Sequence, residues 1–106
     1  AIRMNLERLG FQPCGEVWVR DAAAALTFFD TRGDRFDVIF ADPPYEQGLA
    51  TSILRKAASV GVLADEGLLV LQHSRREGVT ENGEGRFGLA DRRTYGDTVL
   101  SFFTHP

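Results

Sequence analysis

Residues 36–45 read Phe-Asp-Val-Ile-Phe-Ala-Asp-Pro-Pro-Tyr, and this stretch decides the fold. Its apolar part, from Val38 to Phe40, is rich in β-formers and too short for a helix, which predicts a buried strand. The strand ends at Asp42, because Pro43 disfavours helical geometry in the preceding residue and a proline cannot donate to a sheet ladder. A stiff loop therefore follows the carboxyl end of a buried strand, where open α/β sheets bind their ligands.

Apolar periodicity on both sides of this stretch predicts alternating helices and strands. In the expected first helix, Ile2, Leu6 and Leu9 share one face and Gly10 ends the helix. Asp21 is placed to cap the second helix. The expected helices cover residues 1–9, 22–29 and 49–60, and the expected strands cover 16–20, 36–41, 68–71, 87–94 and 98–104. This order argues for a mostly parallel α/β sheet that ends in an antiparallel hairpin.

Length and composition fit one small globular domain of 106 residues. The net charge of −3 does not announce a nucleic-acid partner, although a local basic patch can act alone. Cys14 is the only cysteine, which favours a reducing compartment, and we expect a cytoplasmic protein. No apolar run approaches the ~18 residues of a membrane span. The chain opens with a helix and without Met, so we expect a processed or truncated chain that lacks an upstream strand.

The Asp-Pro-Pro-Tyr loop carries a pattern suited to amino-group recognition. The carboxylate of Asp42 and the carbonyl of Pro43 are two neighbouring acceptors, which match the two donors of an exocyclic –NH2 group. Tyr45 offers a face for a planar base, and such stacking contributes about 1–3 kcal/mol. This set fits a flipped-out or single-stranded base. The competing interpretation is a plain strand-ending turn, since Asp and Pro are common there.

A strand followed by Asp-Pro-Pro-Tyr resembles the catalytic motif of amino-group methyltransferases that use S-adenosylmethionine, which include adenine-N6 and guanine-N2 enzymes. Residues 36–45, 63–71 and 93–103, the last with its Tyr-Gly-Asp-Thr hairpin, look like the bacterial 16S rRNA guanine-N2 methyltransferase family (RsmD-type). The resemblance implies a Rossmann-like methyltransferase fold, partial in this chain. It implies catalytic roles for the loop residues Asp42, Pro43, Pro44 and Tyr45.

The resemblance also implies what this chain lacks. Residues 1–106 match the C-terminal portion of a single methyltransferase domain, without the first two strands and the Gly-rich cofactor loop. Residues 1–9 match the helix after the second of those strands. In the family's sheet the two strands lie between strands 16–20 and 36–41, so both would keep unpaired edges. We therefore expect weak or absent cofactor binding by residues 1–106 alone, and an edge-mediated dimer or a rearranged packing.

Other site residues follow from the same resemblance. Asp21 and its neighbour Ala22, together with Asp42, are expected to bind S-adenosylmethionine, and a capping role for Asp21 is compatible with this. Related sequences often carry Glu where Gln72 stands, which removes one negative charge near the expected cleft. We interpret His73 as a structural residue at a strand end rather than as a base.

Several further sequence patterns are weaker indications of function. Arg75 and Arg76 are candidate RNA contacts, although a solvated mixed-charge surface is the favoured interpretation of their segment. Residues 83–88 match the dinucleotide Gly fingerprint literally, but no strand precedes them and no helix follows. Cys14 is interpreted as a plain thiol. Two distant histidines and one cysteine do not make a metal site, so no metal is expected.

The sequence thus leads to three hypotheses about function. The first is methyl transfer from S-adenosylmethionine to the 2-amino group of a guanine in 16S rRNA, with the assembling small ribosomal subunit as partner and no membrane involved. The second is an adenine-N6 DNA methyltransferase, which the four-residue motif allows equally. The third is a catalytically inert fragment that lacks the cofactor loop.

Overall fold

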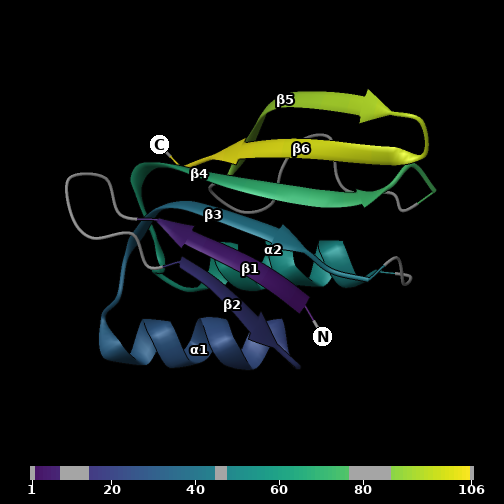
Figure 1. The fold of residues 1–106 in the computed structure, drawn as a ribbon. Helices are drawn as coiled ribbons and strands as arrows, with labels where there is room; N and C mark the ends of the chain where they lie inside the picture. The colour runs from purple at the N-terminus through teal and green to yellow at the C-terminus, as the bar shows by residue number, and fades with distance from the viewer. Residues whose placement is uncertain (1, 8–14, 45–47, 77–86, 106) are drawn as a thin grey trace.

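The computed structural model describes residues 2–7, 15–44, 48–76 and 87–105, with the backbone alone for residues 15–19. These residues form one sheet and two helices (Figure 1). The elements are β1 (Ile2–Glu7), β2 (Gly15–Val19), α1 (Ala22–Arg32), β3 (Phe36–Asp42), α2 (Leu49–Ser59), β4 (Leu63–Ser74), β5 (Gly88–Tyr95) and β6 (Thr98–Thr104).

The six strands form one sheet in the order β2-β1-β3-β4-β6-β5. β3 and β4 pair in parallel, and every other neighbouring pair is antiparallel. The expected mixed α/β architecture with a C-terminal antiparallel hairpin is therefore present. The expectation of a mostly parallel sheet is wrong, because β1 and β6 run antiparallel to their neighbours and only the β3–β4 pair is parallel. β2, β3, β4 and β5 nevertheless all run in one direction, so their carboxyl ends lie at one edge of the sheet (Figure 1).

The first element is a strand, and the expected helix over residues 1–9 is wrong. Ile2, Met4 and Leu6 are buried while Arg3 and Asn5 are half-buried, which is the alternation of a strand with one covered face. β1 lies between β2 and β3 and pairs with both of them. The edge of β3 that the sequence left unpaired is therefore covered by the chain's own N-terminal residues, which is a rearranged packing.

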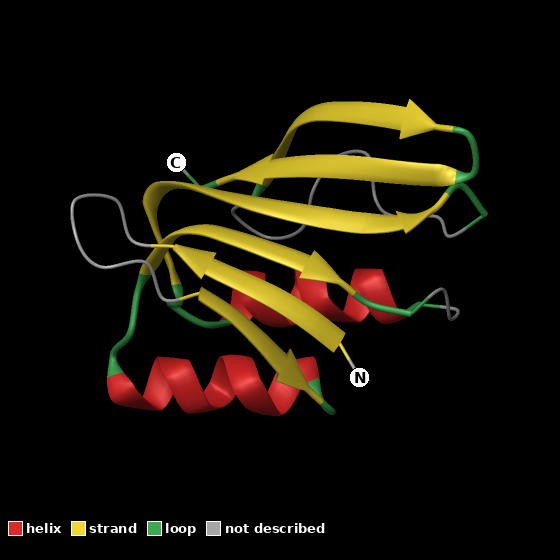
Figure 2. Cartoon of the chain, in the orientation of Figure 1, coloured by secondary structure: helices red, strands yellow, loops and turns green. Residues whose placement is uncertain are grey.

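Both helices pack on the same face of the sheet, as the two-layer arrangement in Figure 2 shows. α2 buries its apolar stripe of Ala50, Ile53, Leu54 and Ala57 there. The main core fills the space between helices and sheet, and its sheet side includes Met4, Ile39, Ala41, Leu69, Leu71 and Phe103. Neither helix in the described ranges has the length and apolar character needed to span a membrane.

The remaining boundaries differ from expectation at two places. α1 continues to Arg32, beyond its expected end at residue 29, and its C-cap is Gly33, whose φ of 77° is left-handed. β4 begins at Leu63, before the expected start at residue 68, and its first half is irregular. There the parallel ladder with β3 shifts register, and Glu66 adopts a positive φ of 65°. The extra residues of β4 between Leu63 and Leu68 are thus accommodated as a bulge.

Candidate active site at the carboxyl edge of the sheet

The carboxyl edge of the sheet gathers most of the predicted site residues. Asp42 is the last residue of β3, and Asp21 lies two residues beyond the end of β2. β4 ends at Ser74, next to the arginines that follow it. Arg3 reaches the same edge from β1, because β1 runs antiparallel and pairs Arg3 with Asp42. One edge therefore presents carboxylates and guanidinium groups from four different segments.

Asp42 forms an ion pair with Arg3. The Nη2 atom of Arg3 donates to the Oδ2 atom of Asp42 at 3.2 Å, and the two side chains are 36% and 27% exposed. The guanidinium also lies over the ring of Phe40, 5.5 Å from its centroid. A solvent-accessible pair of this kind adds little to stability, typically below about 1 kcal/mol. The pair engages the Oδ2 atom of Asp42, so an incoming donor would have to bind the Oδ1 atom or displace Arg3.

The loop after Asp42 is described only in part. Pro43 is buried and Pro44 is exposed, so the first proline anchors the strand end and the second faces outward. Tyr45 lies outside the described residues, and its expected stacking role stays a prediction. The strand end is thus fixed at Asp42 and Pro43, which are the two residues expected to supply hydrogen-bond acceptors.

Asp21 acts as the N-cap of α1. Its Oδ1 atom accepts hydrogen bonds from the backbone N–H groups of Ala23 and Ala24 at 2.9 Å and 3.2 Å. The expected capping role is therefore confirmed. Ala22 is buried in the core rather than open to a ligand through its side chain. Both bonds use the Oδ1 atom of Asp21, and the cofactor contact expected at Asp21 and Ala22 stays a prediction.

His73 belongs to a buried polar network and does not face the site. Its Nδ1 lies 3.0 Å from the Ser74 carbonyl, which can only accept, so Nδ1 carries the proton. Its Nε2 lies 2.8 Å from the Ser101 hydroxyl, which in turn accepts from Nε of Arg92 at 3.1 Å. Both ring nitrogens are engaged, which agrees with the structural role expected for His73.

Arg75 and Arg76 are both exposed beyond the end of β4. Arg75 is tied to the β5–β6 turn, because its backbone N–H donates to the Asp97 carbonyl at 2.9 Å and its Nη1 to the Gly96 carbonyl at 3.5 Å. Arg76 donates its backbone N–H to the Ser74 hydroxyl. RNA contact by either side chain stays a prediction. Within the described ranges, no group of three or more His, Cys, Asp or Glu side chains is arranged to hold a metal ion.

The assembled edge can accept hydrogen bonds from an amino group at a fixed position. Asp42 supplies a half-buried carboxylate whose orientation Arg3 and the β3 backbone determine. Sequence analysis missed Arg3, because the expected helix separated it from Asp42. The alternation of Ile2, Met4 and Leu6 was the signal that could have placed Arg3 on the Asp42 side of the sheet.

Comparison with known proteins adds a family and a fold. The family model described as "Conserved hypothetical protein 95" matches residues 1–104. An Escherichia coli protein described as a proposed methyltransferase is similar in structure, with a TM-score of 0.58 and 23% identity. A hypothetical protein from Thermus thermophilus has a TM-score of 0.59 and 28% identity, and a Haemophilus influenzae protein described as a proposed methylase has 0.57 and 22%.

These solved structures are all longer than this chain. The matches cover 76%, 74% and 68% of this chain but only 44%, 41% and 40% of the E. coli, T. thermophilus and H. influenzae chains, respectively. The chain therefore spans less than half the length of the structures it resembles. No protein of curated function matches it.

Proposed function

The chain belongs to the family described as "Conserved hypothetical protein 95", the RsmD-like family, and from that membership we propose a methyltransferase function. The proposed reaction moves a methyl group from S-adenosylmethionine to the exocyclic 2-amino group of a guanine in 16S rRNA. The observation that carries the proposal is Asp42, a half-buried carboxylate at the carboxyl end of β3 that begins the Asp-Pro-Pro-Tyr motif. The partner proposed for the protein is the assembling small ribosomal subunit, in the cytoplasm.

Asp42 acts in this proposal by orienting the amino group. A guanine amine is a poor nucleophile because its lone pair is delocalised into the ring. A hydrogen bond from that amine to the carboxylate of Asp42, and a second to the Pro43 carbonyl, favour tetrahedral nitrogen and stabilise the developing positive charge. Fixing the amine in position supplies much of the remaining rate enhancement. No covalent intermediate on the protein is needed.

The residues present fit the cofactor in part. Asp21 and Asp42 place carboxylates at the same sheet edge, and each retains acceptor capacity toward an amino or hydroxyl group. Asp21, Ala22 and Asp42 would hold S-adenosylmethionine, which supplies a methyl group activated on a sulfonium. We propose further that residues 1–106 are the C-terminal portion of one methyltransferase domain. The matches cover only 44%, 41% and 40% of the solved relatives, which supports a partial domain.

Replacement of Asp42 tests the proposal in the full-length enzyme. Asp42→Asn keeps the shape of the side chain but removes its charge and one acceptor oxygen, so we expect methyl transfer to fall about 10²–10³-fold. Transfer of radiolabelled methyl groups to immature small subunits measures this. The matched control is Asp97→Asn, in the exposed β5–β6 turn, which should keep wild-type turnover. Wild-type turnover by Asp42→Asn would show that the assigned role is wrong.

The same methyl-transfer assay distinguishes the rRNA methyltransferase from the second hypothesis, a DNA methyltransferase. An adenine-N6 DNA methyltransferase would label duplex DNA and leave ribosomal subunits unlabelled. The resemblance of residues 63–71 and 93–103 to the guanine-N2 family favours the RNA substrate. The third hypothesis, an inert fragment, concerns residues 1–106 in isolation and rests on the position of β1 between β2 and β3.

A further inference from the structure

Gln72 on β4 is the neighbour of Asp42 across the parallel ladder. The register pairs Ala41 with Leu71, and the next residues along the two strands are Asp42 and Gln72. Successive side chains of a strand point to opposite faces, and Gln72 is half-buried between the buried Leu71 and His73. Asp42 and Gln72 therefore share one face of the sheet. Their carboxyl-edge row consists of Arg3, Asp42, Gln72, Leu100 and Arg93 on β1, β3, β4, β6 and β5.

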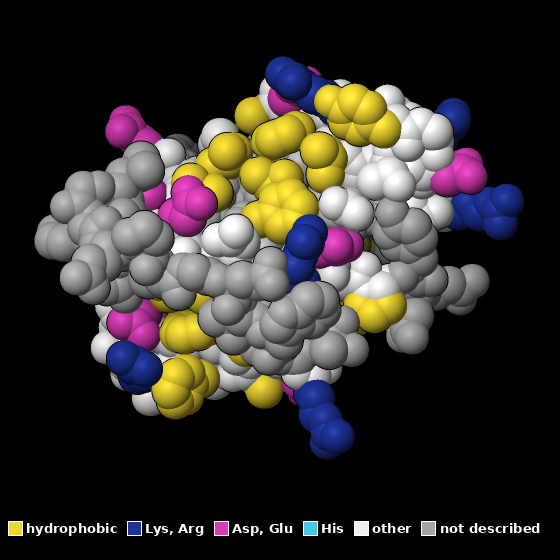
Figure 3. Space-filling view, in the orientation of Figure 1, with side chains coloured by type: hydrophobic (Ala, Val, Ile, Leu, Met, Phe, Trp, Pro, Cys, Tyr) yellow, Lys and Arg dark blue, Asp and Glu magenta, His cyan; other side chains and the backbone are white. Residues whose placement is uncertain are grey.

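The carboxyl-edge row is polar on β3 and β4, whereas the row before it is apolar. Two residues earlier on the same face, Phe40 lies beside Val70, and Val70 lies beside Phe102. Figure 3 shows hydrophobic side chains gathered over these central strands. The change to Asp42 and Gln72 occurs at the carboxyl end of the parallel strands, where open α/β sheets bind their ligands. This placement makes Gln72 a candidate ligand contact.

The amide of Gln72 has unused hydrogen-bonding capacity. Among the residues that the structure describes, none forms a hydrogen bond with this side chain. By contrast, Arg3 in the same row donates to the Oδ2 atom of Asp42 at 3.2 Å. A glutamine amide offers one acceptor oxygen and a nitrogen with two donors. Gln72 can therefore both accept from and donate to a group that is bound at Asp42.

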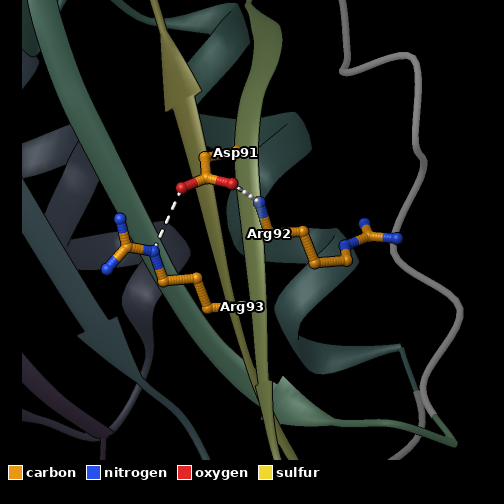
Figure 4. Close-up of polar contacts among 3 residues, drawn as sticks. All are labelled: Asp91, Arg92 and Arg93. Atoms are coloured by element: carbon orange, nitrogen blue, oxygen red, sulfur yellow. Dashed lines mark hydrogen bonds and ion pairs between the residues drawn. The ribbon is translucent and has the colours of Figure 1, made fainter.

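Arg93, at the far end of the carboxyl-edge row, is already engaged. Its Nε atom donates to Asp91 at 3.1 Å (Figure 4), and its guanidinium lies over the Phe102 ring. Hydrogen bonds with Asp91 and then Tyr95 raise the pKa of Arg93, so it stays charged. Three strand spacings of ~4.8 Å separate it from Asp42 by roughly 14 Å, which exceeds the width of one base. Of these two side chains, Gln72 is thus the one placed to contact the same base as Asp42.

The backbone of Gln72 is held on every side. β4 pairs with β3 and with β6, where Gln72 lies opposite Leu100. The next residue is His73, whose two ring nitrogens are engaged by the Ser74 carbonyl and the Ser101 hydroxyl. A side chain on such a rigid strand keeps its donor and acceptor in a fixed position, which recognition of a base requires.

We propose that Gln72 selects guanine as the target base, an inference that rests on the proposed methyl transfer. The Watson–Crick edge of guanine presents the 2-amino group, then the N1–H donor and then the O6 acceptor. With the amino group bound to Asp42 and Pro43, the Oε1 atom of Gln72 accepts from N1–H and its Nε2 atom donates to O6. Adenine, bound through its 6-amino group, presents the N1 acceptor and then a C–H group. It gains one hydrogen bond from Gln72 where guanine gains two.

Gln72→Met in the full-length enzyme tests this selection. Methionine keeps the length of the side chain but removes the amide, so we expect kcat/KM on immature small subunits to fall about 10–100-fold. The matched control is Thr94→Val, because Thr94 is exposed on β5 and lies on the other face of the sheet. This control should keep the wild-type kcat/KM. Circular dichroism of each variant checks that the fold is retained.

A modified substrate distinguishes base recognition from a structural role of Gln72. Mass spectrometry of the wild-type product first locates the methylated guanine, and 2-aminopurine then replaces that one base in reconstituted subunits. This base keeps the 2-amino group but lacks both N1–H and O6. The wild-type enzyme should slow about 10–100-fold on the modified subunits. Gln72→Met should slow much less, because its contacts with those two groups are already absent.

Each outcome of these measurements decides the inference. A wild-type kcat/KM for Gln72→Met would overturn it. Equal slowing of the wild-type enzyme and Gln72→Met by 2-aminopurine would also overturn it, because Gln72 would then only support the fold. If Gln72→Met fails to fold, Gln72→Ala, which adds no bulk, replaces it in the same comparison. A wild-type enzyme that forms no N2-methylguanosine would instead refute the proposed function itself.

Discussion

Single residues at the carboxyl edge have structural duties beside their proposed functional ones. Asp21 shows this most directly, since its Oδ1 atom satisfies two backbone N–H groups at the start of α1. Sequence reasoning could predict the cap, because the signal is local: an Asp immediately before an alanine-rich helix. The same reasoning could not predict the Arg3–Asp42 pair, because its two residues are 39 positions apart and meet only through the sheet.

The two proposed duties of Asp21 can be separated by substitution. Asp21→Ala removes the cap and should lower the free energy of unfolding by about 1 kcal/mol, because two N–H groups lose their acceptor. Asp21→Asn caps nearly as well and should cost far less. Urea unfolding followed by circular dichroism measures both variants. Equal losses for Ala and Asn would contradict the capping account.

In the full-length enzyme, Asp21→Asn then isolates the cofactor role. It preserves the cap but removes the negative charge, so a weaker affinity for S-adenosylmethionine at unchanged stability would support cofactor binding by Asp21. An unchanged affinity would restrict Asp21 to capping.

At the scale of elements, the sequence located five of the six strands and both helices. Short β-rich runs and an amphipathic stripe were sufficient there, as for β3 and α2. The prediction failed for the first element because Ile2 and Leu6 are four residues apart. This spacing suits both one face of a helix and alternate positions of a strand. Met4 distinguishes the two, since it shares a face with Ile2 and Leu6 only in a strand. Residues 2–7 form a strand rather than a helix because they pair with β2 and β3, and no local sequence pattern reveals this pairing.

Substitution of Met4 therefore tests the identity of β1. Its side chain is fully buried, so Met4→Ala should lower the free energy of unfolding by about 2–5 kcal/mol. Asn5→Ala, on the half-buried opposite face, should change it by less than about 0.5 kcal/mol. Chemical denaturation compares the two. A helix with Ile2, Leu6 and Leu9 inside would turn Met4 outward, and a small loss for Met4→Ala would favour that arrangement.

On the scale of the whole molecule, β1 determines what the sheet edge can do. It lies between β2 and β3, where the family resemblance implies two further strands and the cofactor loop. Arg3 then contacts the very carboxylate proposed to receive the substrate amine. This arrangement supports the hypothesis that residues 1–106 are inert alone, while the motif at Asp42 supports the methyl transfer proposed for the full-length protein.

Cofactor binding by the isolated chain measures this directly. We expect isothermal titration of residues 1–106 with S-adenosylmethionine to show weak binding or none, because Asp21 and Asp42 supply only part of the expected contacts. The full-length enzyme is the positive control. Micromolar binding by residues 1–106 would contradict the expectation and show that the described edge is a sufficient cofactor site.

The antiparallel placement of β1 also has a consequence for the order of folding. β1 can pair with β2 early, but its ladder with β3 joins residues as far apart as Arg3 and Asp42. Contacts of long sequence separation form slowly, because loop closure precedes any gain from pairing. During synthesis β1 therefore leaves the ribosome well before its second partner. Until β3 is synthesised, one edge of β1 stays unpaired. During this time the chain is most accessible to chaperones and to other nascent chains.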